Sequence, residues 1–154
     1  MVEAVRRIFP SSFQAIDYIA MTNGKASSYL VSCHHPTAIQ AIFYKLTIPN
    51  LNHLYPHHSM TLHPIGAGDA TAAGTVAAWQ YLKHGKEMHS ELKDPIKDHL
   101  DCFQVDQQWD YEAVVAFGFG LACGSASCLK EQNSVVDMED AIAIMNDIKI
   151  ERMN

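Results

Sequence analysis

The chain has 154 residues, 48% of them hydrophobic, and a formal net charge of −6 from 11 basic and 17 acidic side chains. A chain of this length can bury about 70% of the surface that it exposes when unfolded, so one domain is expected. The scattered basic residues argue against nucleic-acid binding, no apolar run approaches the roughly 20 residues of a membrane span, and no signal peptide is recognisable, so we expect a cytoplasmic protein that binds neither nucleic acid nor membrane.

The N-terminal half reads as short strands joined by turns. Residues 2–9 favour a helix that Pro10 ends. Two strands are expected at 18–21 and 28–32, on either side of Asn23-Gly24, a strong turn signal. A third strand is expected at 41–48. Residues 49–61 then read as an inserted surface loop.

The second half reads mainly as helices. An alanine-rich helix is expected from Ala70 to about His84, and a shorter one with flanking loops within the inserted segment 86–110. Another helix is expected at 111–129, where glycines permit close approach of a sheet or a nucleotide. Acidic residues at 137–140 open a final helix, and 149–153 can form a strand. Strands followed by packed helices predict an α/β layered half-domain.

The most informative stretch is 63–72, with the sequence HPIGAGDATA. Gly66 and Gly68 lack the Cβ atoms that would keep a phosphate from the backbone, and they allow positive φ in a tight turn. A helix that begins there directs unpaired N–H groups and its positive dipole end at the turn. The stretch therefore predicts an anion site, although it matches neither the P-loop nor the G-x-G-x-x-G pattern.

Asp69 has two interpretations, which are compatible with each other. An aspartate at a helix start is commonly an N-cap. It can also be a general base that accepts the proton of a substrate hydroxyl, while the helix N-terminus stabilises charge on a transferred phosphoryl group. The second interpretation makes the site catalytic and not merely anion-binding.

Cysteine and histidine patterns indicate no metal site. The cysteines show no zinc-like spacing and are expected to be free thiols without a catalytic role. The histidines show no helical metal-binding spacing. His63, directly before the glycine turn, is either a solvated loop residue or a neighbour of bound phosphate. The four cysteines are Cys33, Cys102, Cys123 and Cys128.

The segment PIGAGDA at 64–70, followed by Ala73-Gly74, resembles the C-terminal motif of the ribokinase-like (PfkB) carbohydrate kinases. Further matches follow in chain order. Residues 18–25 and 29–32 resemble the family's strand, T-x-G turn and returning strand, and 43–49 resembles the strand before the motif. Residues 117–126 are similar to its late small-residue helix. The ending, 136–140 and 148–150, is most similar to the tagatose-6-phosphate kinase and 1-phosphofructokinase branch.

The resemblance implies an ATP-dependent phosphotransferase that acts on a hydroxyl of a sugar or sugar phosphate, with Mg²⁺ arriving on the nucleotide. Asp69 corresponds to the catalytic base. By the same resemblance, Gly66, Ala67 and Gly68 form the anion hole, Thr22 and Gly24 lie near the nucleotide phosphates and ribose, and Ala122, Gly124 and Ser127 line the adenine pocket. Ser127 stands where relatives commonly carry Asn.

The matches all belong to the C-terminal half of such kinases. Residues 1–154 are thus expected to be a single partial domain of a three-layer α/β/α fold, without the lid and the N-terminal half that binds the sugar. No N-x-x-E segment, which the family associates with Mg²⁺, occurs. We expect weak or no turnover from the chain alone, and a homodimer or the missing N-terminal half as partner. The alternative is a degenerate, non-catalytic binding or interaction module that acts through 49–61 and 86–110.

Overall fold

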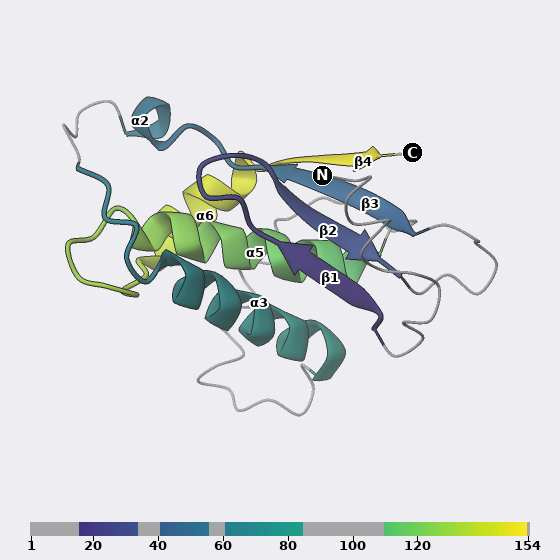
Figure 1. Ribbon diagram of the computed structural model, residues 1–154. Helices are drawn as coiled ribbons and strands as arrows, with labels where there is room; N and C mark the ends of the chain where they lie inside the picture. The colour runs from purple at the N-terminus through teal and green to yellow at the C-terminus, as the bar shows by residue number, and fades with distance from the viewer. Residues whose placement is uncertain (1–15, 34–40, 56–60, 85–109, 154) are drawn as a thin grey trace.

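The computed structural model describes residues 16–33, 41–55, 61–84 and 110–153, which are coloured in Figure 1. The expected helix at 2–9 lies outside the described residues, as do Cys102 and nearly all of the insertion at 86–110.

The described strands form one antiparallel sheet in which chain order and spatial order agree. Tyr18 pairs with Ser32, Leu30 with Tyr44, and other pairs continue the ladder to the last strand. The predicted strands are confirmed, although the third is one residue shorter at each end. The four strands are β1 (Tyr18–Met21), β2 (Ser28–Ser32), β3 (Ile42–Thr47) and β4 (Lys149–Met153).

Helices α3 (Ala67–His84), α5 (Tyr111–Ser127) and α6 (Met138–Asn146) lie together on one side of the sheet (Figure 1). Helix α5 contacts both α3 and α6. It is apolar around its whole circumference, as a helix enclosed by other elements must be, and every residue from Ala113 to Ser127 is buried. The chain is therefore a mixed α/β protein. No helix in the described part of the chain has the length and apolar character needed to cross a membrane.

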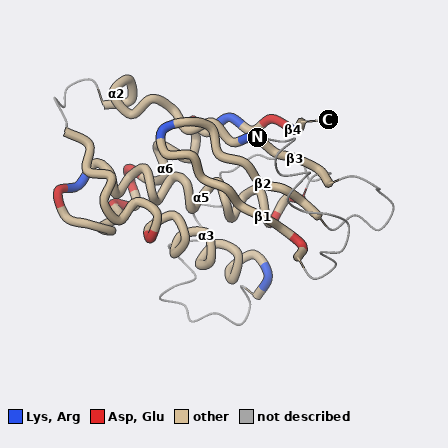
Figure 2. The backbone as a smooth tube through the Cα atoms, viewed as in Figure 1, with Lys and Arg blue, Asp and Glu red and all other residues tan. Residues whose placement is uncertain are grey.

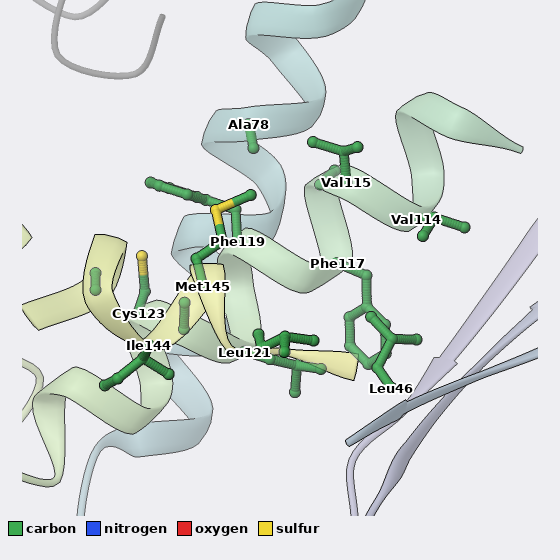
Figure 3. Packing of buried hydrophobic residues seen from close by; sticks show 14 of the residues in the cluster. Leu46, Ala78, Val114, Val115, Phe117, Phe119, Leu121, Cys123, Ile144 and Met145 are labelled. Carbon is green, nitrogen blue, oxygen red and sulfur yellow. The ribbon is translucent and has the colours of Figure 1, made fainter. Parts of the chain in front are cut away.

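The main hydrophobic core lies between the sheet and the helices. Figure 3 shows Phe117 of α5 pointing toward Leu46 of β3, while Ile144 and Met145 enter from α6. The opposite face of the sheet carries a smaller buried cluster around Val31 and Phe43. Residues alternate between the two clusters along β2 and β3, as the pleat of a strand requires. The central strands are thus buried on both faces.

Asp110, which precedes α5, joins this helix to the sheet. Its carboxylate accepts hydrogen bonds from the hydroxyls of Tyr18 (3.1 Å) and Tyr44 (2.8 Å). Burial, with the negative charge of Asp110 and the hydrogen bonds to it, raises the pKa of both phenols to about 12. Two neutral phenols therefore hold one carboxylate at the beginning of the core helix.

This arrangement predicts a loss of stability at high pH. The phenols ionise near pH 10 in the unfolded chain but near pH 12 in the folded one, so the stabilisation is complete below pH 10 and is lost as the pH rises toward 12. Urea unfolding between neutral pH and pH 12 measures it. Tyr44→Phe should lower stability at neutral pH by about 1–3 kcal/mol and make the alkaline decline shallower. Tyr29→Phe is the control, because Tyr29 lies on the face of the sheet opposite to Tyr44. If stability declined with pH as steeply in Tyr44→Phe as in the wild type, the stabilising role of the Tyr44 hydroxyl would be contradicted.

Candidate functional site

A cavity of about 760 Å³ lies where four segments of the described chain meet. They are the turn between β1 and β2, residues 48–52 after β3, the segment around the start of α3, and the last turns of α5. Its volume lies within the range of small-molecule sites, roughly 300–1,000 Å³. The sequence-predicted residues Thr22, Gly24, Ala67, Gly68 and Gly124 all line it.

Helix α3 begins at Ala67, three residues before the predicted start at Ala70. Gly66 has a φ of +84° and its carbonyl accepts the first helical hydrogen bond, from Ala70 N (3.0 Å). A Cβ atom on Gly66 would lie 2.7 Å from the backbone nitrogen of Ser134, so the turn also requires glycine for space. Only Gly66 therefore fits the expected positive-φ position, because Gly68 is already inside the helix with negative φ.

Two backbone amides at the start of α3 have no hydrogen-bond partner among the residues that the structure describes. The amide of Ala67 donates to Pro64 O (3.2 Å), whereas those of Gly68 and Asp69 donate to no described group. Gly68 is exposed and lines the cavity, and nothing lies within 4 Å of the point where its Cβ would be. The unpaired amides and the helix dipole make this end of α3 suited to an anion.

Asp69 is the third residue of α3 and is exposed. It is not the N-cap, because the cap position is occupied by Gly66, so the capping interpretation is wrong. An acidic side chain in the first turn is stabilised by the helix dipole. Asp69 does not line the cavity, although it directly follows Gly68, which does. Its carboxylate is thus accessible from solvent beside the cavity.

The residues of α5 that line the cavity differ in part from the predicted ones. Gly124 lines the cavity, but Ala122 and Ser127 are buried and do not. The hydroxyl of Ser127 instead donates to Gly124 O (2.9 Å). The cavity is bordered by Leu121, Gly124 and Ser125 of this helix and by its C-cap Cys128, which share one face at helical spacing.

Gly124 also has a packing role that explains its small size. A Cβ atom there would lie 2.8 Å from Ala67 O and would overlap the hydroxyl of Thr71. Gly120 shows the same close approach to Thr71 and Thr75 one turn earlier. The glycines of α5 therefore let α3 approach closely, whether or not a nucleotide is bound.

Residues after β3 contribute a wall that the sequence did not indicate. The expected loop at 49–61 contains a short helix, α2 (Leu51–Leu54), whose cap Asn50 accepts a hydrogen bond from Asn52 N (3.1 Å). Both asparagines line the cavity, as does Lys25 from the β1–β2 turn. Two asparagines within five residues of the end of β3 and a lysine directly after the T-x-G turn are the signals that could have indicated them.

Of the described cysteines, only Cys128 lines the cavity. Cys33, Cys123 and Cys128 are free thiols, as predicted. Burial raises the pKa of all three, that of Cys123 to about 11, so they have little thiolate character. His63 is half-buried outside the cavity lining, and its amide donates to Cys128 O (2.9 Å).

Searches against protein-family models and curated proteins find no match to this chain.

Proposed function

We propose that the chain is the nucleotide-binding, catalytic part of an ATP-dependent sugar or sugar-phosphate kinase of the ribokinase-like kind. The observation that carries the proposal is the cavity that joins the Thr22–Gly24 turn, the unpaired amide of Gly68 and the Gly124 face of α5. These segments are far apart in sequence. Each was assigned to the nucleotide from its resemblance to such kinases, so their meeting at one cavity supports the assignment.

The antiparallel sheet and its helices support assignment to the C-terminal portion of a ribokinase-like three-layer α/β/α fold. The strand, T-x-G turn, returning strand and glycine-led helix follow one another in the chain order of a ribokinase-like C-terminal half. In addition, Val31 and Phe43 are nearly fully buried on the face away from the helices, as the middle layer of an α/β/α arrangement requires. The described residues supply the nucleotide side of the site and the catalytic base Asp69, while other residues bind the acceptor sugar.

The start of α3 binds the phosphates, and the Asp69 carboxylate beside the cavity acts on the acceptor hydroxyl. The Gly68 and Asp69 amides bind the γ-phosphoryl oxygens and stabilise the charge that grows on them during transfer. Asp69 accepts the proton of the acceptor hydroxyl. The hydroxyl oxygen then bonds to the γ-phosphorus while the bond to the β,γ-bridging oxygen breaks, so that ADP leaves with that electron pair. The exposed position of Asp69 lets an acceptor approach from outside the cavity.

The described cavity residues fit a triphosphate and do not fit a bare divalent cation. None of them carries a carboxylate, the ligand that Mg²⁺ prefers from proteins. Lys25 and the unpaired amides are instead donors to anions. Mg²⁺ in this proposal is brought by ATP.

Protection of Cys128 from alkylation tests the proposal. Cys128 lines the cavity and its thiol donates to Gly124 O (3.3 Å), so ATP in the cavity should slow its alkylation at least tenfold. The rate is followed by mass spectrometry of the whole chain with and without millimolar ATP. Cys33, which lies outside the cavity lining and whose pKa burial also raises, is the internal control.

Asp69→Asn separates binding from catalysis in the same experiment. Because Asp69 does not line the cavity, ATP should protect Cys128 equally well in this variant. Any ADP release that the wild-type chain shows with a hexose phosphate should fall by about 10²–10⁴. Alkylation of Cys128 that ATP leaves unchanged, or slows no more than that of Cys33, would refute a nucleotide cavity and favour the non-catalytic module.

A further inference from the structure

The charge of the cavity is carried by one side chain among the described residues that line it. Lys25 is that residue, and the other described lining residues are apolar or neutral and polar, with no carboxylate among them. The whole chain is acidic, with a formal net charge of −6. A cavity with a lysine and no nearby acid in its wall is therefore a local site for an anion within an acidic protein.

Lys25 differs from three other described lysines, each of which is paired with an acid. Lys45 pairs with Glu151 (3.1 Å), Lys83 pairs with Glu112, and Lys130 pairs with both Asp137 and Asp140 (3.1 Å each). Within the described part of the chain, Lys25 makes no ion pair or hydrogen bond. Lys149 and Arg152 also lack such a pair, but they lie on β4 and do not line the cavity.

The backbone holds Lys25 at the cavity. Its turn is closed by a hydrogen bond from Ala26 N to Asn23 O (3.0 Å), and Gly24 supplies a φ of +53° that a residue with a side chain rarely adopts. Figure 2 shows this turn at the same end of the molecule as the start of α3. Lys25 and the unpaired Gly68 amide therefore serve the same cavity.

We infer that Lys25 binds the phosphate chain of the nucleotide and makes the cavity select triphosphates over nucleotides with fewer phosphates. The inference rests on the proposed function and adds the cationic contact that the glycine turn cannot provide. An ammonium group on a flexible stem follows a phosphate chain as a point charge, whereas backbone amides fix its position. Discrimination by charge follows, because each further phosphate adds negative charge near the same cation.

The test compares ligands that differ only in phosphate number. Adenosine, AMP, ADP and ATP are titrated calorimetrically into the wild-type chain and Lys25→Met, with inorganic tripolyphosphate as a probe that has no base. Lys25→Met should lower the affinity for ATP and for tripolyphosphate about tenfold. The affinity for AMP should fall less, and that for adenosine should not change. Lys25→Arg should restore most of the ATP affinity, and Lys149→Met is the control for loss of one positive charge elsewhere.

The outcomes separate this inference from the proposed function. The role of Lys25 is refuted, while the nucleotide cavity stands, if the wild type and Lys25→Met bind ATP equally. The same holds if Lys25→Met loses as much affinity for adenosine as for ATP. If the wild type binds tripolyphosphate but no adenosine compound, the Lys25 site stands as a polyphosphate site and the nucleotide assignment fails. If it binds none of the ligands, both are refuted.

Discussion

Replacing Gly68 with valine is expected to weaken ATP binding by more than tenfold, equivalent to about 1.4 kcal/mol, without lowering stability. The side chain would extend from the second residue of α3, where no atom lies within 4 Å of the Cβ position and φ is negative. It would thus enter the open space beside the unpaired amide instead of displacing protein atoms. Valine is also a better helix residue than glycine, so the helix itself loses nothing.

The measurement is an ATP titration, together with urea unfolding of the same sample. Ala73→Val is the matched control, because Ala73 is exposed on the same helix and does not line the cavity. It should bind ATP as the wild type does. If Gly68→Val bound ATP normally, the phosphates could not lie over the amides of α3, and the proposed catalytic geometry would fail.

The strands could be predicted closely, while the start of α3 could not. Asn23-Gly24 marks the end of one strand and the beginning of the next in the local sequence. For α3, Gly66 and Gly68, with one residue between them, are equally able to adopt a positive φ. At Gly66 the folded chain adds a contact from 68 residues away, because the Ser134 hydroxyl donates to Gly66 O (3.3 Å). No local pattern contains that contact.

The site was predicted in part for a similar reason. The glycine turn and the T-x-G turn are local motifs, and the structure brings both to one cavity. Which face of α5 would border that cavity could not be read from sequence, because a helix that is apolar all round has no stripe to set its rotation. Ala122 and Ser127, which the family resemblance assigns to the adenine pocket, do not line the cavity, whereas Leu121 and Ser125 do. The unpaired state of Lys25 depends on where every acid is placed, which only the folded chain shows.

Gly120→Ala is expected to lower the free energy of unfolding by about 1–3 kcal/mol, although alanine favours a helix over glycine by about 1 kcal/mol. The new Cβ would lie 2.5 Å from Thr71 O and 2.9 Å from Thr75 N, and it would overlap the Thr75 hydroxyl. Two of these three contacts are backbone atoms of α3, which cannot turn away as a flexible side chain can. The helices must therefore separate, and the buried face between them loses packing.

Gly74→Ala provides a graded comparison on the opposite helix. Its Cβ would meet the Cys123 side chain, with Sγ at 2.9 Å and Cβ at 3.0 Å, and the Gly120 Cα at 3.1 Å. These contacts are longer than the 2.5 Å and 2.9 Å backbone contacts at Gly120, and the thiol can shift. Urea unfolding followed by circular dichroism should thus show a smaller loss for Gly74→Ala than for Gly120→Ala. Gly120→Ala should also weaken ATP binding, because the contact between α3 and α5 places Gly68 and Gly124 on the same cavity. A Gly120→Ala chain as stable as the wild type would show that the two helices are not held at this distance by their glycines.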